Sequence, residues 1–203
     1  MIRNAVMLAV TVAVLLPLAA MAQDGQRGEV SLQGMAFFTK SASNVNGTSY
    51  SATQSAGGLG TFRYHFGPEL SAEFAYGYAH NTQKYDLSSE AFRIQSQVHQ
   101  ITLAVVANLG HPKKFTPYML VGGGVVVFVP SQNQLNVVTG AQTQGKAAFV
   151  YGGGINYPLQ KNFFFRAEYR GLLYGAPDFG FGGLSTNSIT HSAEPSIGLS
   201  YRF

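Results

Sequence analysis

Apolar and polar residues alternate with a period of two along this chain, and this pattern constrains the fold more than any other feature. In residues 197–203 every odd position is apolar or aromatic, and every even position is small or polar. In residues 163–170 the odd positions are again apolar, while the even positions end in Arg166, Glu168 and Arg170. A helix would spread these charges around its circumference, whereas a strand places them on one face. The pattern therefore predicts β-strands.

Eight segments in total alternate in this way, and most are close to the length of about 9–11 residues that crosses a bilayer as a tilted strand. Besides the two segments above they are Val30–Phe38, Leu59–Phe66, Leu70–His80, Val98–Asn108, Tyr118–Val129 and Lys146–Tyr157.

The predicted connections alternate between short and long. The short ones are 67–69, 109–115 and 158–161, and the long ones, rich in Ser, Thr, Asn, Gln and Gly, are 40–55, 81–96, 130–145 and 175–190. Barrels of bacterial outer membranes have short periplasmic turns and longer extracellular loops. The pattern thus predicts an all-β protein, an eight-stranded antiparallel up-and-down transmembrane β-barrel.

The composition indicates that the outer surface of this barrel meets lipid. Charged residues make up only 11% of the 203 residues, and the chain holds 15 Phe and 11 Tyr. A soluble domain carries about 25% charged residues. Alternation alone also fits a soluble lipocalin-like barrel, but the polar positions are rarely charged, and aromatic residues gather near the strand ends as in the two girdles of a membrane barrel. These aromatic residues are Phe66, Tyr118, Tyr157, Phe163, Tyr201 and Phe203 near the short turns, and Tyr78, Phe128 and Tyr174 near the long loops.

The first 22 residues have the pattern of an export signal. Arg3 supplies a positive charge, residues 5–19 are apolar, and Ala20-Met21-Ala22 is a small-x-small cleavage site. We predict a signal peptide over residues 1–22, with cleavage between Ala22 and Gln23, followed by a single outer-membrane β-barrel domain over residues 23–203.

Two further motifs carry a resemblance to a known family. The terminal Tyr201-Arg202-Phe203 and the segment Pro117-Tyr118-x-x-x-Gly122-x-Gly124, together with the strand count, resemble the small outer-membrane barrels of the OmpA transmembrane-domain and OmpX-like type. This resemblance implies a location in the bacterial outer membrane, contact with its lipid, and recognition of Tyr201 and Phe203 by the barrel-assembly machinery. We expect no peptidoglycan-binding domain, because the chain ends with its last predicted strand.

The candidate site is the interior of the barrel, which eight strands leave just wide enough for side chains. With the apolar positions outward, the charged residues that face the lumen are Arg63, His65, Glu73, Arg166, Glu168, Arg170 and Arg202. The short turn 67–69 predicts that Arg63 lies opposite Glu73, which leaves a lumen weighted toward arginine. We interpret this set as a salt-bridge plug, and a gate or narrow conductive path is the alternative.

The functional hypothesis is a structural or surface-interaction barrel whose extracellular loops bind an external ligand or surface. A narrow channel for small solutes is the first alternative, and a lipid A-modifying enzyme is the second. Lipid A deacylase barrels use a His-x-Ser arrangement, but His191 and Ser192 are adjacent and would point to opposite faces of a strand. We therefore predict no enzyme activity and no catalytic residue.

No cofactor, metal or nucleic acid is expected to bind. The chain has no cysteine, and its histidines show no metal-ligand spacing. The net charge is +4, but Lys113-Lys114 is the single basic pair, so no basic stripe could follow a phosphate backbone.

Overall fold

The computed structural model of the chain describes residues 27–40, 42–43, 49–87, 90–110, 114–130, 142–180 and 188–203. Within these ranges the strands are β1 (Gly28–Thr39), β2 (Ala42–Ser43), β3 (Ser49–Ala52), β4 (Ser55–His65), β5 (Leu70–Leu87), β6 (Glu90–Asn108), β7 (Thr116–Pro130), β8 (Gln144–Pro158), β9 (Phe163–Gly175) and β10 (Ile189–Arg202). None of the described segments is a helix long and apolar enough to cross a membrane.

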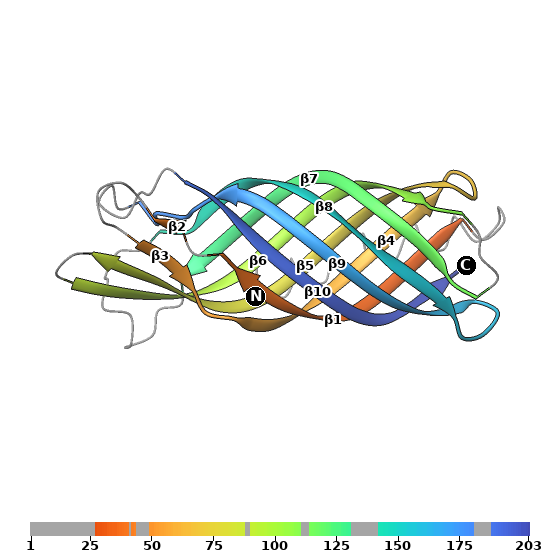
Figure 1. Cartoon of the computed structure of the whole chain (residues 1–203), viewed down its shortest axis with the longest axis horizontal. Coiled ribbons are helices and arrows are strands. Elements are labelled where there is room, and N and C mark those ends of the chain that lie inside the picture. Colours follow the sequence, from red (N-terminus) through yellow and green to blue (C-terminus); the bar gives the residue numbers. More distant parts are fainter. Residues whose placement is uncertain are drawn as a thin grey trace, which may run out of the picture.

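Eight of these strands form a closed antiparallel barrel (Figure 1). Each long strand pairs with the next along the chain, and β1 pairs with β4 on one side and with β10 on the other. The two short strands extend this wall at one end, where β2 pairs with β3, and β3 pairs with β5. The predicted eight-stranded antiparallel barrel is confirmed.

The first short turn sets the register of its hairpin as the sequence predicts. The backbone N–H of Phe66 donates to the carbonyl oxygen of Leu70 at 3.0 Å. Arg63 then lies opposite Glu73, and His65 lies opposite Ser71. Because side chains alternate between the two faces, this register places both pairs inside the barrel.

The second long loop is shorter than the sequence predicts. Most of residues 81–96, predicted as a loop, continue β5 to Leu87 and begin β6 at Glu90, and the two strands pair up to Leu87 and Glu90. Polar and apolar residues still alternate in Lys84-Tyr85-Asp86-Leu87, but the apolar positions there are odd-numbered, whereas Phe74, Tyr76 and Tyr78 earlier in β5 are even-numbered. The change of parity ends the uniform pattern that predicts a membrane strand, and the prediction therefore stops short of the continuation.

The seam between β1 and β10 is interrupted near its middle. Its paired residues run from Glu29 with Arg202 to Met35 with Ser196, and resume at Phe38 with Ala193. Pro195 lies in this gap and has no backbone N–H to donate. The first and last strands are thus joined by a long and a short set of pairs.

The outer face of the barrel is apolar. Leu32, Leu103, Met119, Ile197 and Leu199 each have more than half of their surface exposed, as expected for side chains that contact lipid rather than water.

The predicted aromatic girdles are only partly correct. Phe66, Tyr78, Tyr157, Phe163 and Tyr201 lie exposed on the outer face, but Tyr118, Phe128 and Tyr174 are buried in the interior, with at most 2% of their surface exposed. These three residues share the face of their strands that carries the other inward residues, so nearness to a strand end does not by itself place an aromatic ring at the interface.

Candidate functional site

The end of the lumen next to the short turns, called the turn end, holds a layer of charged side chains. This charged layer consists of Arg63, Arg166, Arg170, Arg202, His65, Glu29, Glu73 and Glu168. Six of the sequence-predicted residues are buried in it, namely Arg63, His65, Glu73, Arg166, Glu168 and Arg170. The seventh, Arg202, lies at the end of β10 with 30% of its side chain exposed. The structure therefore brings all seven residues to one side of the barrel wall, together with Glu29.

Glu29 joins one half of this layer. Its Oε2 atom accepts hydrogen bonds from Nε and Nη2 of Arg202 at 3.0 and 2.7 Å, and lies 3.3 Å from Nε2 of His65. Its Oε1 atom pairs with Arg166. His65 is held from its other side by Ser71, whose hydroxyl lies 2.8 Å from Nδ1. The single carboxylate of Glu29 thus contacts two guanidinium groups and an imidazole.

Glu73 and Glu168 join the other half. Nε and Nη2 of Arg63 donate to Oε2 of Glu73 at 3.0 and 2.7 Å, and Nη1 of Arg166 lies 3.6 Å from the same oxygen. Arg170 pairs with Oε1 of Glu73, and its Nε donates to Oε1 of Glu168 at 2.6 Å. Buried charges cost free energy unless they are paired and hydrogen-bonded, and here each carboxylate meets at least two arginines.

Tyr118 lies between the two halves. Its hydroxyl donates to Oε2 of Glu168, and the guanidinium of Arg63 lies 4.4 Å from the centre of its ring. The ring occupies the space over Gly154, where an added Cβ would stand 2.6 Å from the tyrosine hydroxyl oxygen. Gly154 therefore leaves the room that Tyr118 needs to reach the carboxylate.

Sequence reasoning missed three members of this interior. Glu29 precedes the predicted start of the first strand by one residue, Glu194 lies between the last loop and the last predicted strand, and Tyr118 was assigned to the outer face. All three share the alternation of the inward residues, so extending each strand by that rule would have found them. With Glu29 and Glu194 included, the expected excess of arginine is wrong, because four glutamates face four arginines.

The opposite end of the lumen, next to the long loops and called the loop end, holds an apolar layer instead. Its buried side chains are Met35, Phe37, Leu59, Val98, Val126, Phe128, Val150, Leu172 and Tyr174. Phe179, from the segment after β9, lies fully buried against it, with its ring centre 6.3 Å from that of Phe128. The apolar layer thus fills the lumen beyond the charged layer.

A set of polar contacts, here called the clasp, holds Phe179 in place. The backbone N–H groups of Asp178 and Phe179 donate to Oε1 of Gln144 at 2.8 and 3.2 Å, and Nε2 of Gln144 donates to Oδ1 of Asp178 at 2.7 Å. Nζ of Lys146 lies 3.7 Å from Oδ2 of Asp178. Phe179 has a φ of 51°, in the left-handed region that a bulky residue rarely adopts. The surrounding contacts must therefore hold this backbone conformation.

Comparison with known proteins identifies the family. The family described as outer membrane protein beta-barrel domain matches residues 8–203. The chain belongs to this family. It is accordingly a small barrel of the bacterial outer membrane, as the resemblance in the sequence implied. No curated protein matches the chain in sequence.

Solved structures with the same fold include two small outer-membrane proteins. The crystal structure of OprG from Pseudomonas aeruginosa has a TM-score of 0.60 and 15% identity, over 87% of this chain and 96% of that one. The crystal structure of Neisserial surface protein A has a TM-score of 0.59 and 15% identity, over 86% of this chain and 97% of that one. At this identity the likeness shows the fold alone.

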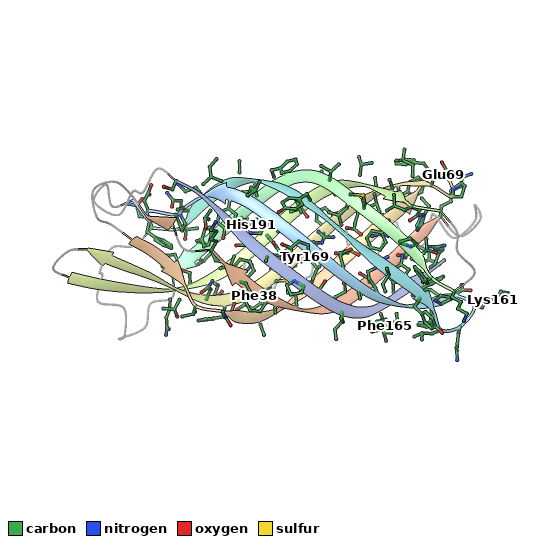
Figure 2. All side chains as sticks on the ribbon, in the orientation of Figure 1. Phe38, Glu69, Lys161, Phe165, Tyr169 and His191 are labelled. Carbon is green, nitrogen blue, oxygen red and sulfur yellow. The ribbon has the colours of Figure 1, made fainter. Side chains whose placement is uncertain are left out.

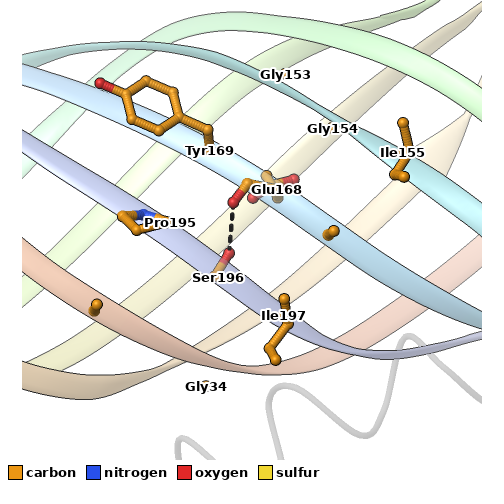
Figure 3. A pocket seen from close by; sticks show the side chains of 11 residues that line it. Gly34, Gly153, Gly154, Ile155, Glu168, Tyr169, Pro195, Ser196 and Ile197 are labelled. Carbon is orange, nitrogen blue, oxygen red and sulfur yellow. Dashed lines mark hydrogen bonds between the residues drawn. The ribbon is translucent and has the colours of Figure 1, made fainter.

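The outer face of this outer-membrane barrel has a shallow apolar groove of about 590 Å³ across β1, β8, β9 and β10 (Figure 3). Small residues form its floor, among them Gly34, Ala36 and Gly153, and Tyr169 and Ile197 stand at its sides. Within the wall the hydroxyl of Ser196 donates to the carbonyl oxygen of Glu168 at 3.4 Å. The groove lies on the lipid-facing surface and holds no charged side chain pointing outward among its described lining residues.

The candidate catalytic pair of the enzyme alternative is separated by the barrel wall. His191 faces outward, where its Nε2 lies 3.0 Å from the hydroxyl of Tyr151 (Figure 2). Ser192 is buried inside, 2.7 Å from the hydroxyl of Tyr174. A nucleophile needs its base within hydrogen-bond reach, so these two residues cannot act as a pair. In the part of the chain that is described, no group of histidine and acidic residues could hold a metal ion.

Proposed function

We propose that this barrel is a rigid membrane scaffold that displays its loop end, above all the β5–β6 hairpin, for surface interaction. The observation that carries the proposal is the contrast between the two parts of the molecule. The lumen is filled by the charged layer and then by the apolar layer, while β5 and β6 continue outward past their neighbours (Figure 1).

The length of the hairpin supports this role. Pairing of β4 with β5 ends at Ala79, and pairing of β6 with β7 ends at Ser96, whereas β5 and β6 stay paired as far as Leu87 and Glu90. Beyond the barrel wall the short strand β3 alone among the described strands accompanies them, along Gln83–Asp86 of β5. About seven residues of extended strand at 3.3 Å each give a projection of roughly 20 Å. Binding segments are usually loops that a rigid scaffold positions, and a paired hairpin presents such a segment with little loss of entropy on binding.

Two measurements test the proposal. Protein purified from outer membranes should give no steady conductance in planar lipid bilayers, and deletion of residues 84–93 should reduce adhesion of expressing cells to glass and polystyrene and their aggregation. The deletion variant must still migrate faster unboiled than boiled on a denaturing gel, as a closed barrel does. Steady openings of the wild-type protein, or unchanged adhesion and aggregation with the folded deletion variant, would refute the scaffold role.

A narrow channel is the second candidate, and the inward face of β10 favours it. This face is polar along the barrel, with Thr190, Ser192, Glu194, Ser196 and Ser200 buried in the interior. A conductive path along it would require the apolar layer to move aside. If this candidate holds, Phe179→Ala should raise the conductance above that of the wild-type protein, and equal silence of both proteins would exclude it.

Biogenesis is the remaining part of the proposal. We infer that the barrel-assembly machinery reads Tyr201 and Phe203, because their outward-facing aromatic rings end the closing strand and lie 6.2 Å apart at their centres. The predicted cleavage between Ala22 and Gln23 lies outside the described residues and stays a prediction, which sequencing the N-terminus of the purified protein would test.

A further inference from the structure

The turn end of the lumen opens into a polar cavity of about 390 Å³, here called the vestibule. It is lined by the ends of six barrel strands, the first turn and the residue before β1, and its polar lining residues include Arg27, His65, Thr116, Asn156 and Arg202. The charged or titratable side chains among its described lining residues are all bases, and none is a carboxylate. The cavity therefore presents donors of hydrogen bonds and positive charge to whatever enters it.

The floor of the vestibule neutralises this charge only in part. Glu29 lies directly beneath, but its two oxygens are already engaged by Arg166, Arg202 and His65. Within the described ion pairs of the charged layer, four guanidinium groups share three carboxylates. The fourth inward glutamate, Glu194, accepts a hydrogen bond from Gln100 at 2.9 Å and forms none of these ion pairs. The ion-paired groups by themselves therefore carry one positive charge more than their carboxylates neutralise, although Glu194 makes the numbers of inward arginines and glutamates equal.

Of the four guanidinium groups in these ion pairs, that of Arg202 lines the vestibule. Arg63, Arg166 and Arg170 have at most 2% of their side chains exposed, whereas 30% of the side chain of Arg202 is exposed. The guanidinium of Arg202 is fixed from two sides, because it donates to Glu29 and lies 4.9 Å from the centre of the Phe164 ring. A guanidinium that is already oriented pays little entropy to bind a further anion, and low-dielectric walls strengthen the attraction.

Neutral groups on the lining suit an oxyanion as well. The Oδ1 atom of Asn156 accepts a hydrogen bond from Nε of Arg166 at 2.8 Å, so the amide nitrogen is the end of this side chain that can donate elsewhere. Thr116 adds a hydroxyl from the start of β7. Charge-assisted hydrogen bonds from arginine together with neutral donors are the usual means of holding a carboxylate or phosphate group.

We propose that the vestibule is a binding site for a small oxyanion, a carboxylate or phosphate group, that enters the barrel from its turn end. Arg202 provides the principal contact, and Arg27 and the neutral lining groups complete the site. In barrels of this kind the short turns face the periplasm, so the ligand is drawn from that compartment. The site is independent of the loop end, and it would stand even if the proposed surface role failed.

The test uses isotope-labelled protein purified from outer membranes in detergent micelles. Sodium phosphate and sodium acetate are titrated separately at constant ionic strength, with chloride as the replaced ion, and backbone amide shifts are followed by nuclear magnetic resonance. We expect saturable shifts at the turn end, in Gly67, Asn108 and Thr116, and small shifts at the loop end. The ion that saturates at the lower concentration identifies whether phosphate or carboxylate is the preferred ligand.

Variants make the result specific. Arg202→Gln should weaken binding by about tenfold or more, the expected loss for one charge-assisted hydrogen-bond donor. Arg27→Gln removes the other arginine of the lining and provides a second test, in which binding should also weaken. Lys161→Gln, in the turn between β8 and β9 (Figure 2), removes a nearby positive charge that does not line the vestibule and should leave binding unchanged.

Two results would overturn the proposal. The first is a linear, non-saturating response to both ions in the wild-type protein. The second is equal binding by the wild-type, Arg202→Gln and Arg27→Gln proteins, provided that their unboiled mobility on a gel shows that all three are folded.

Discussion

Arg63 and Glu73 face each other directly across the β4–β5 hairpin, and the guanidinium donates two hydrogen bonds to one carboxylate oxygen. Neither side chain has measurable exposure. The pair is also the point at which Arg166 and Arg170 join the charged layer. Its loss should therefore affect more than one hairpin.

The first prediction concerns this carboxylate. Glu73→Ala should destabilise the folded barrel by about 3–5 kcal/mol, because it leaves buried guanidinium groups without their partner. Glu69→Ala, in the exposed turn of the same hairpin, should change stability by less than about 0.5 kcal/mol. Urea unfolding in detergent micelles measures both. Equal midpoints for the two variants would contradict this account of the charged layer.

The second prediction concerns the room under Tyr118. Gly154→Val should lower stability by about 1–3 kcal/mol or more, since the new side chain would collide with the tyrosine ring and with the carbonyl oxygen of Ala167. Gly58→Val is the matched control, because a Cβ there would meet no atom within 4 Å. The amount of folded barrel in the outer membrane, read from unboiled gel mobility, should fall for the first variant alone.

The third prediction concerns pH and the clasp. Burial on its own would raise the pKa of Asp178, but hydrogen bonds from Gln144 and the Gly180 amide and the charge of Lys146 outweigh it and lower the pKa below its usual value. A carboxylate with a lowered pKa stabilises the folded state fully above its unfolded pKa of about 3.9 and loses this effect as the pH falls through the folded value. The clasp should hold at pH 7 and loosen below about pH 4.

Hydrogen exchange at the Phe179 amide measures this loosening, expressed as protection relative to an unfolded peptide at the same pH. Protection should fall on acidification in the wild-type protein. Asp178→Asn should show lower protection at pH 7 and little further loss in acid. Protection that does not depend on pH in the wild-type protein would show that Asp178 does not control the clasp.

The fourth prediction concerns the end of the closing strand. Deleting Phe203 removes two backbone hydrogen bonds to Gly28, at 3.0 and 2.8 Å, and an aromatic ring next to Tyr201. This should reduce the level of barrel in the outer membrane more than deletion of residues 44–48 in the first loop, since loops tolerate such changes. Quantitative blotting of outer-membrane fractions gives the comparison, and normal levels of the Phe203 deletion would argue against the assembly role.

The membrane part of the fold could be predicted because lipid imposes a strict alternation on each strand. The register of Arg63 with Glu73 followed from a turn too short to allow another one. The projecting hairpin was not found in this way, since its apolar positions, such as Tyr85 and Leu87, have the opposite parity to those of the membrane part of β5. Phe179 is a different case, because its burial depends on packing between a loop residue and distant strands, which no local pattern encodes.

The interruption at Pro195 gives the wall an uneven resistance to force. From the turn end, pairing between β1 and β10 extends without a break from Glu29 to Met35 and then fails before Phe38. If β1 and β10 were pulled apart from their turn ends, the hydrogen bonds between them would break one after another. At the gap no pairing between the two strands would resist the separation. We expect the barrel to rupture along this seam in two force steps, a long one followed by a short one.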